Sequence, residues 1–330
     1  NWMVVIASNH GGAYTILPTE DDHTILSNPK VNSFIIFSSP DYMPSFVDKP
    51  YTGNRYIGKG VHLSGTDLNA VYGSITDLNH NYDFGDSTGF TIEFKIKVML
   101  GANGDYTYSN TPVLSKRASL DPGVIGWAVV LNQKAWQINI GQNVPGKTDN
   151  LVVSGADISD GNWHDVAAVI SIDTTDKSRH VRTFTDGAFN NDLNISGSGS
   201  LNNTEPLVLG YQPYTASYPA PDVYMTEIKL WIDAAADATI SKYACETSLP
   251  DSHPLKDKKV GYWPARDGQG GVLKDESTIV TNFQLKGPYN WLDFNDLICP
   301  ASPANISQLM PQPVDVSRQI MDWLQVSADL

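Results

Sequence analysis

The sequence predicts a mainly β protein whose body is a sandwich of the jelly-roll kind, with a small α/β part formed by the N-terminal strands and a C-terminal helix. Residues 91–98 (TIEFKIKV) alternate apolar and charged side chains, which is the period of a strand with one buried and one wet face. The runs 127–131 (WAVVL) and 136–140 (WQINI) flank a short connection, and this pattern indicates a hairpin. Many short strands between turns rich in Gly, Asn and Asp are typical of an antiparallel sandwich.

The order of these strands carries a resemblance. The segments GKGVHLSG, FGDSTGFTIEFKIKV, GNWHDVAAVISID, VRTFTDGAFNN, PLVLGYQP and VYMTEIKLWIDA are similar, in that order, to a laminin G-like (LamG) domain over residues 55–245. Trp163-His164 before an apolar strand and Asp186-Gly187 at a hairpin turn are typical of that family. The resemblance implies a concanavalin A-like jelly-roll sandwich, in which we expect Trp163 and Trp231 to fill the core and His164 to be structural.

The N-terminal run is apolar and ends in a polar turn. Met3 to Ala7 reads as a buried strand of the parallel type, and Asn9 and His10 follow it in the turn, where open α/β sheets place their ligands. NWMVVIASNHGG and the next strand, within residues 28–42, resemble type I phosphodiesterases/nucleotide pyrophosphatases of the alkaline phosphatase superfamily. In that family the turn reads Asp-His-Gly and binds zinc, whereas an Asn side chain is a poorer zinc ligand than a carboxylate. We interpret Asn9 and His10 as a degenerate metal site.

The C-terminal segment completes this part of the chain. Residues 311–326 (PQPVDVSRQIMDWLQV) have the apolar stripe of an amphipathic helix and resemble the closing helix of the phosphodiesterase family. The predicted organisation is therefore a phosphodiesterase-like remnant at 1–54, a LamG sandwich at 55–245, a cap or extra hairpin of unknown function at 246–300, and the closing helix at 301–330. The sandwich would be an insertion whose ends meet. A similar LamG-plus-tail order occurs in secreted Bacteroidetes proteins, so we expect an exported protein, periplasmic or at the cell surface.

The composition and charge of the chain argue against some classes of binding partner. The chain has 330 residues, 41% of them hydrophobic, and a formal net charge of -14, which argues against nucleic acid because the phosphate backbone is bound by clustered Lys and Arg. The apolar runs are shorter than the roughly 20 residues that span a bilayer. The two cysteines, Cys245 and Cys299, cannot form a zinc site alone, and we expect them to form a disulfide in an exported chain.

Few motifs for catalysis are present. The sequence contains no Glu-x-Asp-x-x-Glu run of the kind that sandwich glycosidases carry and no His-Glu-x-x-His pair. The nucleophile and first metal carboxylates of the phosphodiesterase family would lie upstream of Asn1. We therefore expect no enzymatic activity from this chain. The acidic loop residues Asp83, Asp86 and Asp121 are candidate calcium ligands, with solvated turns as the alternative.

The remaining candidates are loop tyrosines. Two segments, 106–110 (YTYSN) and 211–219 (YQPYTASYP), combine Tyr with Ser, Thr or Asn, a mixture that offers flat apolar faces and hydrogen bonds to a sugar. The predicted glycan-binding residues are Tyr106, Tyr108, Tyr214 and Tyr218, and packing of these rings against the sandwich is the alternative. Three functions stay open: a carbohydrate-binding module, an accessory fragment of a metal-dependent phosphodiesterase, and a protein-docking module.

Overall fold

The computed structural model describes residues 4–7, 35–38, 55–65, 69–83, 88–99, 108–147, 149–210 and 220–298. Contacts divide the chain into two units, residues 1–53 with 300–330 and residues 54–299. In the first unit, β1 (Val4–Ala7) pairs with β2 (Ile35–Ser38) in antiparallel register. The expectation of a parallel-type strand is therefore wrong, and an antiparallel partner needs no crossover connection. Asn9, His10 and the predicted helix at 311–326 lie outside the described residues.

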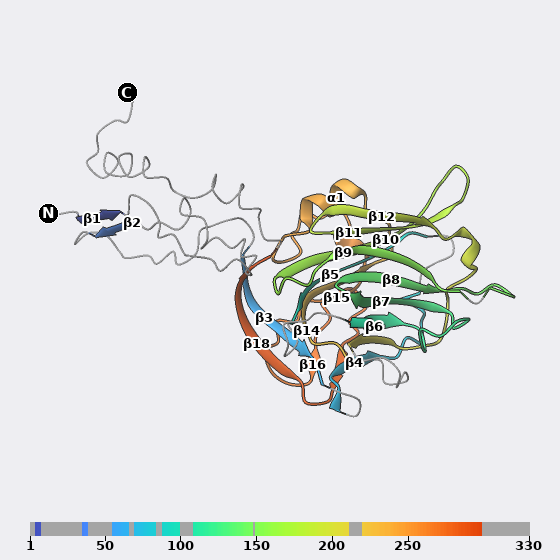
Figure 1. Ribbon diagram of the computed structural model, residues 1–330, viewed down its shortest axis with the longest axis horizontal. Helices are drawn as coiled ribbons and strands as arrows, with labels where there is room; N and C mark the ends of the chain where they lie inside the picture. Colours follow the sequence, from blue (N-terminus) through green and yellow to red (C-terminus); the bar gives the residue numbers. More distant parts are fainter. Residues whose placement is uncertain are drawn as a thin grey trace, which may run out of the picture. The chain divides into compact units, whose positions relative to one another are not determined.

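The second unit is built from two antiparallel sheets, shown face to face in Figure 1, so the predicted mainly β sandwich is confirmed. The first sheet has the order β12 (Ala188–Asn194), β11 (Arg179–Thr185), β10 (Trp163–Ile172), β5 (Phe90–Val98), β14 (Val223–Trp231), β3 (Arg55–Leu63), β18 (Asn290–Leu297), and β15 (Lys259–Trp263) also pairs with β14. The second has the order β16 (Val272–Leu273), β17 (Phe283–Lys286), β4 (Tyr72–Ile75), β13 (Leu207–Gly210), β6 (Tyr108–Lys116), β7 (Gly126–Gln133), β8 (Ala135–Gly141), β9 (Leu151–Asp157). The α-helix α1 (Asp237–Tyr243) and two 3-10 turns, η3 (Ser196–Ser198) and η4 (Lys256–Lys258), complete the described elements.

The core lies between the two sheets and follows the period of the strands. The predicted hairpin is β7 with β8, in which Trp127 lies opposite Ile140 and Leu131 opposite Trp136. Alternate residues of β5 point into the same core, where Phe94 is buried. Burying one such side chain is worth about 1.5 to 3 kcal/mol, and most of the buried hydrophobic side chains belong to this main core.

The outer face of the first sheet is covered rather than wet. Trp163 and Trp231 are fully buried, but they pack on this outer face in two smaller clusters and not in the main core. Beside them, Lys95 forms a buried ion pair with Asp165 at 2.7 Å. The expected wet face of residues 91–98 is thus wrong for most of its length, because α1 and the chain after it lie over the strand and the charges there are paired.

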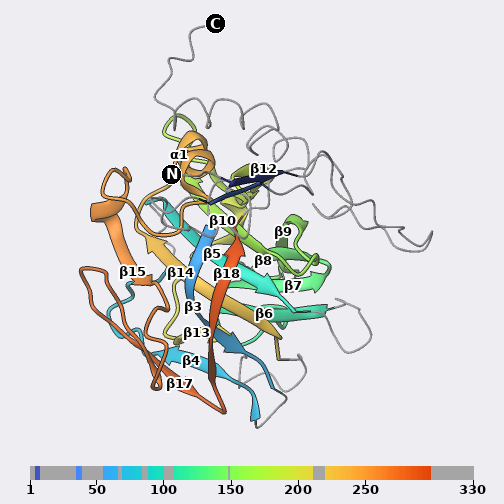
Figure 2. The same cartoon turned by 90° about the vertical axis from the view of Figure 1, so that its left-hand side faces the viewer.

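The segment expected to be a cap or extra hairpin, 246–300, contains a hairpin, β16 with β17, but its described strands extend both sheets and do not form a separate cap. β15 adds to β14, β18 forms a long edge beside β3, and β16 and β17 prolong the second sheet through β4 (Figure 2). The main core continues into this region through Trp263 and Phe283. The sandwich therefore runs to the end of β18. In the part of the chain that the structure describes, no helix is long and apolar enough to cross a membrane.

Candidate functional site

Of the four tyrosines predicted to bind a glycan, the structure describes only Tyr108. Its ring is half-buried against the main core, and its hydroxyl donates a hydrogen bond to the Asp222 carbonyl oxygen at 3.2 Å. Tyr108 therefore packs against the sandwich, which was the alternative to glycan binding. Tyr106, Tyr214 and Tyr218 lie outside the described residues, so their role stays a prediction.

The two candidate calcium ligands that the structure describes, Asp83 and Asp121, do not form a common site. The Asp83 carboxylate is buried and lies 3.0 Å from the Lys116 ammonium and 2.7 Å from a ring nitrogen of His80. Asp121 accepts a hydrogen bond from the Ser119 hydroxyl in an exposed turn, and Asp86 lies outside the described residues. No cluster of three His, Cys, Asp or Glu side chains that could hold a metal occurs among the described residues. Asp83 therefore belongs to a buried ion-pair network.

The structure describes one of the two cysteines predicted to form a disulfide. Cys245 is disulfide-bonded and lies near Trp163, Tyr224 and Ile298. Its predicted partner, Cys299, lies outside the described residues, and the pairing stays a prediction.

His164 joins two turns to the start of β10. One ring nitrogen lies 2.8 Å from the Asp186 carboxylate and the other 2.9 Å from Asp160. Burial alone would lower the pKa of His164, but these two carboxylates raise it to about 9. The hydrogen bonds from His164 and Asn162 hold the pKa of Asp160 well below its usual range, against the opposing effect of burial. His164 therefore has a structural role, and we call the charged His164 ring with its two partners, Asp160 and Asp186, the clamp.

This clamp predicts a pH dependence of stability. An unfolded His has a pKa near 6.5, so the stabilisation by His164 is complete below that pH and is lost as the pH rises through about 9. The Asp160 contribution is lost at the other end, as the pH falls below about 4. We expect the free-energy difference between the wild type and His164→Gln to shrink by about 2 kcal/mol from pH 6 to pH 9.5, after allowance for screening at half-exposed Asp160. Urea unfolding at both pH values measures it, with His180→Gln as the control. An equal difference at both pH values would contradict the clamp.

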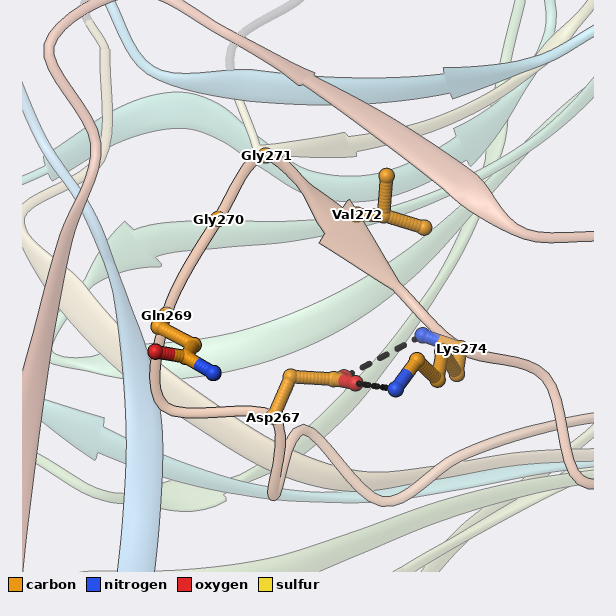
Figure 3. Close-up of a pocket in the computed structure, with 6 residues that line it drawn as sticks. All are labelled: Asp267, Gln269, Gly270, Gly271, Val272 and Lys274. Carbon is orange, nitrogen blue, oxygen red and sulfur yellow. Dashed lines mark hydrogen bonds and ion pairs between the residues drawn. The ribbon is translucent and has the colours of Figure 1, made fainter.

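The structure shows an open pocket that the sequence did not reveal. We define the loop pocket by the residues that line it in Figure 3: Asp267, Gln269, Gly270, Gly271, Val272 and Lys274. Its volume of about 430 Å³ is within the range of small-molecule sites. It lies on the connection between β15 and β16, where the chain leaves the first sheet and enters the second. Gly270 has a φ of 74°, a left-handed conformation that glycine adopts without strain.

Two aromatic side chains contact the glycines of the loop pocket. The Trp291 indole donates a hydrogen bond to the Gly270 carbonyl oxygen at 3.0 Å. Tyr289 packs so close to Gly271 that an added Cβ would lie 3.1 Å from its hydroxyl oxygen. The Tyr289 side chain is 37% exposed, and Trp291 is partly buried against the main core. The pocket therefore has aromatic surface beside it, part of it open to solvent.

The polar groups of the loop pocket are held in place. The Asp267 carboxylate accepts a hydrogen bond from the Lys274 backbone N–H at 3.2 Å and lies 3.4 Å from the Lys274 ammonium, a pair drawn in Figure 3. The neighbouring Arg266 guanidinium donates to the buried carboxylate of Glu227 at 2.5 Å. Glu227 has a φ of 51° at an irregularity in β14, which aims its side chain toward the loop. These contacts fix the start of the loop to the sheet.

The arrangement can bind a polyhydroxylated ligand. A carboxylate has about four acceptor sites, so Asp267 retains capacity for further donors, and Gln269 supplies both donors and acceptors. An exposed aromatic ring adds an apolar face. The sequence contained signals for this site, the Gly-rich run at 267–271 and the aromatic pair at 289–291, but their proximity results from the pairing of β16 with β17.

The two antiparallel sheets and the loop pocket define a concanavalin A-like sandwich with a ligand-sized site on one connection. The chain belongs to the Laminin_G_3 family of the concanavalin A-like lectin/glucanases superfamily, which matches residues 71–241. The loop pocket lies beyond the matched residues, in the strands that prolong the sandwich.

Solved structures are similar to the chain at low sequence identity. A candidate carbohydrate-binding protein from Bacteroides ovatus ATCC 8483 superposes with a TM-score of 0.53 at 14% identity, over 81% of this chain and 65% of the other. The binding domain of Paraclostridial Mosquitocidal Protein 1 gives 0.40 at 10% identity, over 59% of this chain and 52% of the other. The receptor-binding domain of botulinum neurotoxin D gives 0.41 at 10% identity, over 61% of this chain and 46% of the other. The chain thus spans less than two thirds of each of these proteins. No curated protein sequence matches it.

Proposed function

We propose that the sandwich is a non-catalytic carbohydrate-binding module and that the loop pocket is its binding site. The observation that carries the proposal is the pocket itself, which is lined by Asp267 and Gln269 and has the ring of Tyr289 packed against Gly271 in its wall. Sugars are bound in this way, with hydroxyls on polar groups and the apolar face on an aromatic ring. The superfamily of the chain, and its likeness to a candidate carbohydrate-binding protein, support the same class of ligand.

We also propose a role for the segments outside the sandwich and a location for the protein. The module is attached to a phosphodiesterase-like segment in which Asn9 replaces a metal-binding carboxylate, so the chain acts by binding and not by turnover. A disulfide at Cys245 supports an exported location, because disulfides persist in oxidising compartments.

The test is a binding measurement on the full chain. One exposed ring and a few hydrogen bonds predict a dissociation constant from millimolar to tens of micromolar, roughly 4 to 6 kcal/mol. We expect affinity electrophoresis against a panel of polysaccharides to show retardation, and Tyr289→Ala to weaken the binding about tenfold, or about 1.4 kcal/mol. The chain length of the bound glycan should not change during incubation.

The matched control is Phe189→Ala. Phe189 is also an exposed aromatic residue, 55% accessible. It lies on β12, which forms the edge of the first sheet opposite to β18. Equal weakening by both variants, or retention of full affinity by Tyr289→Ala, would assign the binding elsewhere. The loops with Tyr106, Tyr214 and Tyr218 are then the next site to test.

A further inference from the structure

The cations that border the loop pocket are all held by carboxylates. Lys274 lies 3.4 Å from Asp267, and Arg266 lies 2.5 Å from Glu227. A third cation, Lys59 on β3, packs its side-chain stem against Gly268 and lies 2.5 Å from Asp293.

These pairs differ in how easily they open. Glu227 is fully buried, and removing Arg266 from it would leave a buried charge without its partner, a change that costs several kcal/mol. Arg266 therefore stays paired with Glu227 and does not bind a ligand in the pocket. Lys59 and Asp293 are both exposed, so their ion pair is weak. Their opposite charges nevertheless leave no net charge at this side of the pocket.

Of the two charged side chains that line the pocket, the anion Asp267 is the more enclosed. The Asp267 side chain is only 11% exposed and is fixed by a backbone N–H, whereas the side chain of Lys274 is 75% exposed and projects into solvent. A ligand in the pocket thus meets the carboxylate as a positioned acceptor, and the ammonium as a mobile group already paired with it. Sugar hydroxyls can donate to such an acceptor, whereas a uronate or sulfate group would be repelled by it and would have to compete with it for the Lys274 ammonium.

Resting on the proposed function, we infer that the loop pocket selects neutral glycans and rejects acidic ones, with Asp267 as the residue that determines this specificity. The site then takes the hydroxyl groups of an uncharged sugar on Asp267 and Gln269, and one sugar face on Tyr289. Because no ion pair forms with the ligand, the affinity should be almost independent of salt.

The experiment compares neutral and acidic polysaccharides with matched backbones: dextran with dextran sulfate, hydroxyethyl cellulose with carboxymethyl cellulose, and methyl-esterified with de-esterified homogalacturonan. We expect the neutral member of any bound pair to bind at least tenfold more tightly, with less than a twofold change between 50 and 500 mM NaCl, on the order expected when no charges pair. Asp267→Asn should weaken neutral binding and reduce the neutral-to-acidic ratio about fivefold, because it removes the repelling charge and releases Lys274.

The control is Asp192→Asn, which makes the same change of charge on β12 at the far edge of the sheet and should leave the ratio unchanged. Equal or tighter binding of the acidic member, weakened by salt, would overturn the selectivity and leave the proposed function intact. The same ratio for Asp267→Asn and wild type would remove Asp267 from this role. Failure of every glycan to bind would overturn the proposed function and the inference with it.

Discussion

Replacement of Lys116 by Met is expected to destabilise the sandwich by about 3 to 5 kcal/mol, the cost of breaking a buried ion pair by removing one partner. The Lys116 ammonium is fully buried and lies 3.0 Å from Asp83 and 3.5 Å from Asp77. It also donates to the Asn203 carbonyl oxygen at 2.9 Å. Without the cation, two buried carboxylates would face each other, and neither can reach bulk water.

Urea unfolding measures this effect as a lower midpoint with an unchanged slope. Lys134→Met, in the exposed β7–β8 turn, is the matched control and should change stability little. Adding Asp83→Asn to Lys116→Met should recover part of the loss, because one of the two buried carboxylates that had contacted the Lys116 ammonium is then neutral. A loss below 1 kcal/mol for Lys116→Met would show that the ion-pair network does not stabilise the fold.

Reduction of the disulfide at Cys245 is expected to have an effect of similar size. In the chain-entropy model a crosslink over a long loop is worth about 4 kcal/mol, as an upper value. The loop from Cys245 to Cys299 would contain β15, β16, β17 and β18, which are strands of both sheets. Opening it would free the unfolded chain over the region that also carries the loop pocket.

Two measurements check the disulfide. Non-reducing peptide mapping should find Cys245 joined to Cys299, and unfolding with and without reductant should differ by several kcal/mol, up to the roughly 4 kcal/mol of the entropy model. The double variant Cys245→Ser, Cys299→Ser should behave like the reduced protein and no longer respond to reductant. Two free thiols in the mature protein, or no change on reduction, would refute the pairing.

The sandwich could be predicted because its long strands carry a strong local signal. In β5 apolar and polar side chains alternate, and β7 and β8 are two largely apolar runs on either side of a short turn, so these segments are recognisable as strands. The covering of the outer face could not be predicted in the same way. Lys95 looks like a solvated residue in the sequence, and only the ion pair with Asp165 across the strands shows that it is buried.

β16 and β17 are hard to predict because they are short, with two and four residues, too few for a period to be recognised. β18 has eight residues, but its place beside β3 is a pairing between segments far apart in the sequence, which a local pattern does not indicate. The loop pocket lies on one segment, around the connection between β15 and β16, and the aromatic side chains beside it are brought there by sheet pairings that local sequence does not encode. Composition instead drew attention to loop tyrosines, of which Tyr108 uses its hydroxyl to bind the backbone.

The measurement that tests the central claim most directly is hydroxyl-radical footprinting of the full chain with and without a saturating neutral glycan. If the loop pocket is the binding site, the ligand should reduce oxidation of Tyr289 and Trp291 and leave Phe189 unchanged. Protection confined to other residues, such as Tyr214 and Tyr218, or equal oxidation of Tyr289 and Trp291 with and without the ligand, would contradict the account.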